Sequence, residues 1–237
     1  MKSVQVAELQ ALEEVCALSK SRLKFSKTGM GKYISHLDLL RAFTRAITRA
    51  ELPVRYTQGF NPHQIITFSL PLPIGVTSET EFVDIDFEES ANNSLIMEKL
   101  NENLPPDIRI ISVGELLHSA SDICLADYEI NLKAPENIDD SIVTEFFGKE
   151  NVPVMKKTKK GDKEVNLMDY INNVGTLDFA QNEANMKITL SAGGAMNIKP
   201  DIMISALERE LGYEFDEVYI HRTKIYVNEN DKICEME

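Results

Sequence analysis

Tryptophan is absent from this sequence of 237 residues and cysteine is scarce, which excludes several classes of protein. The three cysteines, Cys16, Cys124 and Cys234, lie roughly a hundred residues apart and form no CxxC pair, so they predict neither a zinc site nor an iron–sulfur cluster. The sequence also lacks GxSxG, HExxH and a phosphate-binding glycine loop. We therefore expect no metal and no cofactor, and we find no motif of a known catalytic class.

Long hydrophobic runs are missing as well. The first twenty residues contain Glu8, Glu13 and Glu14, where a signal peptide would need an uninterrupted apolar segment. Hydrophobic residues make up 43% of the chain and charged residues 27%, which is an ordinary globular composition. The sequence therefore indicates a cytoplasmic protein of one or two domains without a membrane partner.

Charge is unevenly distributed along the chain. The 38 acidic residues outnumber the 25 basic ones and give a net charge of −13. Residues 21–63 nevertheless hold eight basic side chains against two acidic ones, and residues 156–163 hold five lysines against one aspartate. This asymmetry argues against a general nucleic-acid coat and indicates anion-facing regions on an otherwise acidic body.

Hydrophobic periodicity predicts a mixed α+β fold. An amphipathic helix is expected first, over residues 4–18. The pattern then predicts, in order, a strand (22–26), a helix from the Ser35 cap to Pro53, two strands (66–70 and 82–87), a helix (95–104) and a strand (108–113). This βαββαβ order is typical of a ferredoxin-like domain, in which two helices pack on one face of a four-stranded sheet.

A polar linker at residues 118–122 separates this domain from a second half in which the order partly recurs. We expect a strand (128–133), a helix (138–148), a hairpin (154–157 with 163–167) turning at Gly161–Asp162, a strand (186–191), a helix (200–211) and a strand (218–227). Residues 170–182 interrupt this scheme as an extra strand or loop. The sequence thus predicts an N-terminal helix (1–20) followed by two tandem ferredoxin-like units, 21–120 and a less regular 121–237.

The first helix of the first unit carries a basic stripe. Arg41, Arg45 and Arg49 recur at helical spacing, opposite the apolar face begun by Leu40. Guanidinium groups pair bidentately with phosphate oxygens, so the stripe can bind an anion. It can equally be a solvated helix face, in which Asp38 caps the helix and pairs with Arg41.

Two histidines flank this stripe in the sequence. His36 begins the helix, where it can reach an anion or merely hydrogen-bond within the capping turn. His63 follows Asn61 and Pro62 and can join His36 in one site or simply close its own turn. A shared site requires the start of the helix to face the loop 58–63.

The lysine-rich hairpin is a second candidate for anion binding. Its lysines can contact a nucleic-acid backbone, or they can protect an exposed strand edge from aggregation. Aromatic side chains for base stacking are few, and Phe82, on the polar face of its strand, is the strongest candidate. An RNA-recognition-motif mode of binding therefore has little support.

Several segments taken together point to a family. They are SHLDLLRAF, RAELPVRYTQGFNPH, LPLPIGVTSETEFVDIDF, KKTKKGDKEVNLMDYI and NIKPDIMISAL. In these segments the chain resembles the radical-SAM-linked family of unknown function, found in bacteria fused to or encoded beside radical S-adenosylmethionine proteins. Gln64, Asn166 and Asp169 depart from the residues expected there. The resemblance implies a role in RNA modification or translation and a radical SAM protein acting in trans, because this chain lacks the cluster cysteines.

The leading hypothesis is an RNA-binding or substrate-presenting adaptor without catalytic activity of its own. The residues expected to contact RNA or another anion are His36, Arg41, Arg45, Arg55, Asn61, His63, Lys156, Lys157, Lys159 and Lys160. One alternative is a metal-independent endoribonuclease of the tandem ferredoxin-like type, with His36 or His63 as general acid or base. Another is a scaffold that docks an acidic protein surface without RNA.

Overall fold

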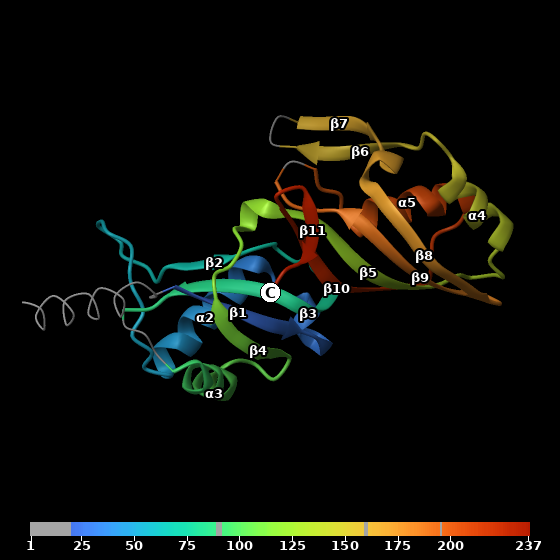
Figure 1. Cartoon of the computed structure of the whole chain (residues 1–237). Helices are drawn as coiled ribbons and strands as arrows, with labels where there is room; N and C mark the ends of the chain where they lie inside the picture. Colours follow the sequence, from blue (N-terminus) through green and yellow to red (C-terminus); the bar gives the residue numbers. More distant parts are fainter. Residues whose placement is uncertain (1–19, 89–91, 159–160, 195) are drawn as a thin grey trace, which may run out of the picture. The chain divides into compact units, whose positions relative to one another are not determined.

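The computed structural model describes residues 20–237 except 89–91, 159–160 and 195 (Figure 1). The predicted N-terminal helix lies outside the described residues. The described chain is mixed α+β, as the sequence predicts, and divides into two compact units. The first contains residues 20–74 and 79–119, and the second contains residues 75–78 and 120–236. None of the helices in the described residues is long and apolar enough to cross a membrane.

The first unit has six main elements and a 3₁₀ turn. They are β1 (Lys20–Lys27), η1 (Gly29–Tyr33), α2 (His36–Arg49), β2 (Ile66–Phe68), β3 (Val76–Asp86), α3 (Asn93–Asn103) and β4 (Ile108–Glu115). The strands lie in the order β4-β1-β3-β2. Side chains of α2, α3, β1, β3 and β4 share one hydrophobic core, so both helices pack on the same face of the sheet.

Helix α2 forms where the sequence predicts it. The Ser35 hydroxyl accepts a hydrogen bond from the Asp38 backbone N–H and so caps the first turn. The buried face includes Leu39 and Phe43, whereas Leu40 is only half-buried, so the predicted apolar face was wrong by one residue at its start. The arginines still lie on the side opposite the core.

Strand β3 differs most from its prediction in the first unit. It begins at Val76, six residues before the predicted strand. The sequence pattern missed this start because the early polar side chains, such as Thr77 and Thr80, are buried and show no alternation of polar and apolar residues. Phe82 is 2% exposed and packs beneath the cations of Arg22 and Lys24. The expectation that Phe82 could stack on a base is therefore wrong.

The second unit contains a four-stranded antiparallel sheet with the order β10-β5-β9-β8. Its elements are η2 (Ala120–Asp122), β5 (Ile123–Lys133), α4 (Asp140–Gly148), β6 (Pro153–Thr158), β7 (Gly161–Asn166), η3 (Leu167–Tyr170), β8 (Ile171–Ala180), β9 (Glu183–Ser191), α5 (Pro200–Leu211), β10 (Glu217–Glu229) and β11 (Lys232–Glu235). Strand β11 pairs with β10, and the first residues of β3, Val76–Ser78, pair with β10 in parallel.

The interruption in the second unit is the hairpin and not residues 170–182. Strands β6 and β7 form a separate two-stranded sheet, while β8 joins the main sheet beside β9. Gly161 already pairs with Thr158, so the turn was predicted too late in the sequence. Strand β8 lies at the edge of the main sheet and its pairing with β9 shifts register twice, so its sequence lacks the strict alternation expected of a strand.

Candidate nucleic-acid interface

The outward face of α2 carries two exposed guanidinium groups. Arg41 donates from Nη1 to Asp38 Oδ1 at 2.8 Å, and Arg45 has no ion pair among the described residues. The Ser35 hydroxyl donates to the other Asp38 oxygen at 2.7 Å. The hydrogen bond from Ser35, and then that from Arg41, lowers the pKa of Asp38 below its usual value. Asp38 thus holds Arg41 in place while Arg45 remains available to an anion.

The third arginine of the predicted stripe is engaged elsewhere. Arg49 donates from Nε to the side-chain oxygen of Asn103 at 3.4 Å and from Nη2 to the Asn103 backbone carbonyl. It therefore joins α2 to the end of α3. The anion-facing stripe is reduced to Arg41 and Arg45.

The loop 57–63 is a closed turn that projects an aromatic ring. The Thr57 N–H donates to the His63 carbonyl at 2.9 Å, and the Thr57 hydroxyl lies 3.1 Å from His63 Nδ1. Gly59 adopts a φ of 137°, which a residue with a side chain rarely reaches. Phe60 at the tip is fully exposed, as is unusual for a phenylalanine. Phe60 was not predicted as a functional residue, although its place between Gly59 and Asn61 is a sequence signal of exposure.

Gln64 ties this loop to α2. Its amide Nε2 donates to the Thr48 hydroxyl at 3.2 Å and to the Tyr56 hydroxyl at 3.4 Å, and the side chain is buried. Thr48 lies seven residues after Arg41, which places it on the same outward face of the helix. The outward face of α2 with Arg41 and Arg45, together with the loop 57–63, is called the α2–loop surface below.

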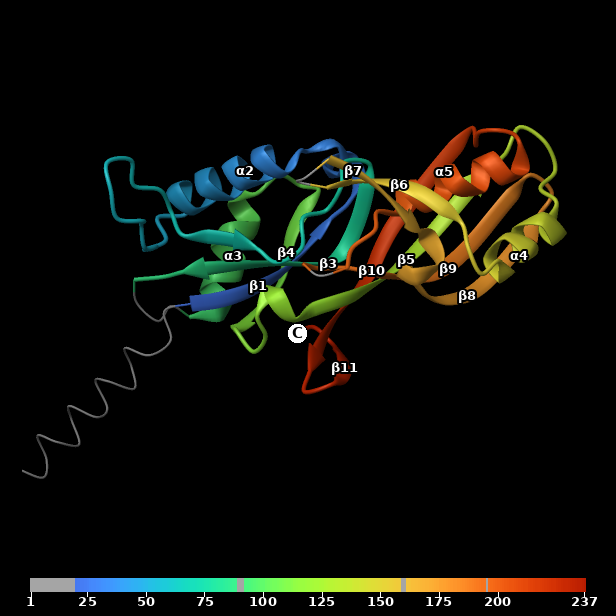
Figure 2. The ribbon, with the colours of Figure 1, turned by 90° about the horizontal axis from the view of Figure 1, so that it is seen from above.

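The two histidines are not brought together by the structure. The ring of His36 packs edge-to-face against Phe68, with 5.3 Å between centroids. His63 lies next to Gln64, which contacts Thr48, and the twelve residues from His36 to Thr48 span ~18 Å of helix. Helix α2 begins at His36, and Figure 2 shows the loop beyond the other, C-terminal end of this helix.

The other predicted residues lie in different surroundings. Arg55 is exposed, and its Nη1 lies 3.8 Å from Asp86 Oδ1 at the base of the loop. Lys156 and Lys157 belong to β6 in the second unit, where Lys156 lies over the ring of Tyr170 at 4.9 Å. Lys159 and Lys160 lie outside the described residues.

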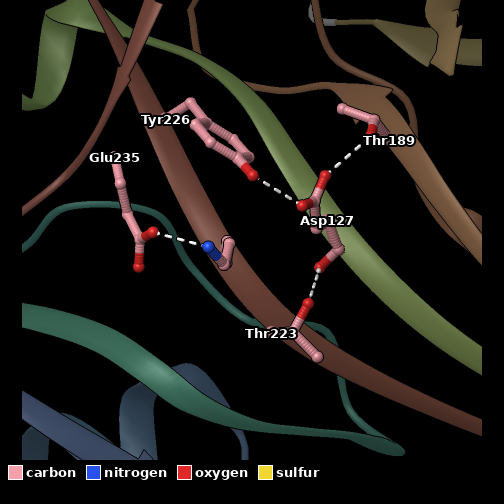
Figure 3. A network of polar contacts seen from close by, with 6 residues as sticks. Asp127, Thr189, Thr223, Tyr226 and Glu235 are labelled. Atoms are coloured by element: carbon pink, nitrogen blue, oxygen red, sulfur yellow. Dashed lines mark hydrogen bonds and ion pairs between the residues drawn. The ribbon is translucent and has the colours of Figure 1, made fainter.

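The second unit contains a polar network that the sequence did not predict (Figure 3). The Asp127 carboxylate accepts hydrogen bonds from the Thr189 hydroxyl at 2.6 Å and the Tyr226 hydroxyl at 2.7 Å. Burial, and then the hydrogen bond to Asp127, raises the pKa of Tyr226 above its usual value. Strands β5, β9 and β10 each contribute one of these side chains, so the network joins neighbouring strands.

Two solved structures share the fold of this chain at low sequence identity. A crystal structure of a Cbf5–Nop10–Gar1 complex matches with a TM-score of 0.51 and 8% identity, over 90% of this chain and 50% of that one. A structure of an H/ACA RNP bound to a substrate RNA containing 2'-deoxyuridine matches with a TM-score of 0.50 and 8% identity, over 90% and 49%. The chain thus spans about half the length of the chains it matches.

None of the curated proteins compared with this chain matches it. A protein-family model matches residues 20–200, which is well over half of the sequence. The chain therefore belongs to the bacterial family described as uncharacterized protein conserved in bacteria (DUF2344).

Proposed function

We propose that this chain binds single-stranded RNA through the α2–loop surface. The observation that carries this proposal is the fully exposed ring of Phe60 on a loop that Gln64 anchors to the arginine-bearing helix. Arginines contact phosphates without regard to sequence, and exposed aromatic rings stack on unpaired bases. The combination of both side-chain types is typical of single-strand binding.

The fold supports the proposal indirectly. We propose that both units are ferredoxin-like, because in each the four main strands lie in the order fourth, first, third, second. One structure with a similar fold is a ribonucleoprotein bound to a substrate RNA. A fold hosts many functions, so this likeness adds to the site argument and does not replace it.

We propose binding without RNA cleavage. The ring of His36 packs on Phe68, and His63 Nδ1 lies near the Thr57 hydroxyl and the Asn61 carbonyl. Among the described residues, neither imidazole has a carboxylate or second base at hydrogen-bond distance. Purified protein should leave single-stranded RNA intact in the presence of chelator. Metal-independent scission that His36→Ala or His63→Ala abolishes would refute this part of the proposal.

A radical SAM protein is the proposed partner. This part rests on the sequence resemblance alone, which covers the SHLDLLRAF and GFNPH segments that contribute Arg41 and most of the loop to the α2–loop surface. An adaptor of this kind would hold RNA while the partner carries out the chemistry. Co-purification of the full chain, with mass spectrometry of bound protein and sequencing of bound RNA, tests the partner and the RNA in one experiment.

Two variants test the RNA surface itself. Arg41→Ala/Arg45→Ala should weaken binding of a labelled single-stranded RNA and reduce the slope of log K against log salt by up to ~1.4, because each phosphate contact contributes ~0.7. Phe60→Ala should weaken binding by ~1–3 kcal/mol without changing that slope, since a stacking contact releases no counterion.

The matched control removes two charges elsewhere. Lys187 and Lys232 are exposed lysines of the second unit, and changing both to Ala also lowers the net charge by two. This control should bind RNA nearly as the natural sequence does. Equal losses in the control and in Arg41→Ala/Arg45→Ala would indicate general charge attraction and would contradict a defined surface.

A further inference from the structure

A pocket of about 350 Å³ opens in the second unit between β6 of the hairpin and the start of α5. Its lining includes Met155, Lys156, Lys157, Lys199, Asp201 and Ile202. The volume is at the lower end of the ~300–1,000 Å³ that small-molecule sites occupy. The pocket therefore has room for a ligand the size of a nucleotide.

Positive charge in this pocket is not balanced by the protein. Three lysines line it with one carboxylate, Asp201, and none of the three has an ion pair among the described residues. Burial, and then the neighbouring Lys163, lowers the pKa of Lys156. Formal charges in the pocket sum to about +2, and a phosphate monoester carries about −1.5 to −2 at neutral pH.

The wall that bears Lys156 and Lys157 is held firmly. At the base of the hairpin, the Asn166 side chain accepts from the N–H groups of Val152 and Met168 and donates to the Glu150 carbonyl and to Asp169. These four bonds use the full hydrogen-bonding capacity of an asparagine amide. The Lys156 ammonium is also fixed over the ring of Tyr170. A site whose walls are already ordered loses less entropy on binding.

Beside these charged groups the pocket is lined by Asn197 and by two apolar side chains, Met155 and Ile202. Met155 is 57% exposed, although methionine is usually buried, and Ile202 follows the start of α5. A thioether is polarizable and packs well against flat aromatic groups. The ligand that fits this lining has an anionic end and a flat apolar end.

We propose that this pocket binds a phosphate monoester of nucleotide size, with the phosphate among the three lysines and the base against Met155 and Ile202. The monoester can come from a free nucleoside monophosphate or from the phosphorylated end of an RNA strand. The site is separate in the sequence from the α2–loop surface, so it is tested independently of the proposed function.

Calorimetry on the full chain distinguishes the two sources. The probes are adenosine monophosphate, inorganic phosphate, and an adenosine trinucleotide with either a 5'-phosphate or a 5'-hydroxyl. Binding of the monophosphate supports a free nucleotide, and binding of the 5'-phosphorylated trinucleotide alone supports an RNA end. Equal binding of the two trinucleotides, inorganic phosphate binding as tightly as the monophosphate, or no binding of any phosphorylated probe overturns the proposal.

Variants locate the binding. Lys157→Gln/Lys199→Gln should weaken the monophosphate or the phosphorylated trinucleotide by at least ~10-fold, because two charge-assisted contacts are lost. The control Lys187→Gln/Lys232→Gln removes the same charge from exposed positions outside the pocket and should bind normally. Equal losses in both variants overturn the assignment. Arg41→Ala/Arg45→Ala should leave monophosphate binding unchanged, whether or not it impairs RNA binding.

Discussion

Arg22 of β1 and Asp84 of β3 form a buried ion pair in the first unit, and mutation of either residue should strongly affect the stability of that unit. Nε and Nη2 of Arg22 donate to the two Asp84 oxygens at 2.8 and 3.0 Å, and the side chains are 2% and 6% exposed. Arg22 Nη1 is buried without a hydrogen-bond partner among the described residues. Two charges are thus held out of water with one donor unsatisfied.

Removing either partner alone should be costly. Asp84→Leu leaves a buried guanidinium without its anion, and Arg22→Met leaves a buried carboxylate without its cation, so each should lower the free energy of unfolding by ~3–5 kcal/mol. The double variant buries no charge and should fall within ~1 kcal/mol of the natural sequence. The double-mutant cycle should therefore give a coupling of at least ~5 kcal/mol.

Urea unfolding followed by circular dichroism measures these differences. A chain of two units can unfold in two steps, so hydrogen exchange of β1 amides identifies the transition of the first unit. Lys187→Met provides a control, because its ion pair with Glu129 is exposed and should contribute little. Single variants that each cost less than ~1 kcal/mol, with additive effects in the double variant, would refute the reasoning.

Three further predictions concern single side chains. Because the folded-state pKa of Tyr226 is raised, its contribution to stability should be present below pH ~10 and lost as the pH rises further. Tyr226→Phe should therefore flatten the decline of stability at alkaline pH, and an unchanged decline would contradict the role of its hydrogen bond to Asp127. Because the pKa of Asp38 is lowered, the contribution of Asp38 to stability should be present above pH ~4 and lost as the pH falls through its folded-state pKa. In acid unfolding, the stability difference between the natural sequence and Asp38→Asn should therefore shrink in that pH range. A constant difference would contradict the capping role. Asn166→Ala should cost ~2–3 kcal/mol and speed hydrogen exchange in β6 and β7, whereas unchanged exchange would show that the hairpin does not depend on this side chain.

Local sequence patterns predicted most elements of the first unit. The order from β1 to β4 follows from alternation, a serine cap and prolines, all of which act within a few residues. The start of β3 could not be found in this way. Val76–Ser78 pair with Ile220–Arg222 of β10, which are distant in the sequence, and that pairing buries polar side chains that look like a loop.

The candidate site was predictable in part. Helical spacing placed Arg41 and Arg45 on the outward face of α2, because that periodicity depends only on the helix. The same spacing could not show that Arg49 bonds to Asn103 on α3, since that contact joins separate elements. Nor could the sequence show that the loop bearing His63 is anchored near the C-terminal end of α2, away from His36 at its start. Their separation depends on where the loop is anchored.

Counting basic residues in the sequence overstates the charge that an RNA would meet. Of the eight basic residues at positions 21–63, Arg22 and Lys27 are buried. Arg49 is bonded to α3, and Arg41 shares its charge with a carboxylate. The α2–loop surface and its base therefore offer about three guanidinium groups, those of Arg41, Arg45 and Arg55. For single-stranded RNA this predicts a slope of ~2 in log K against log salt. A slope of five or six would require phosphate contacts well beyond it, on a body whose net charge of −13 repels the strand.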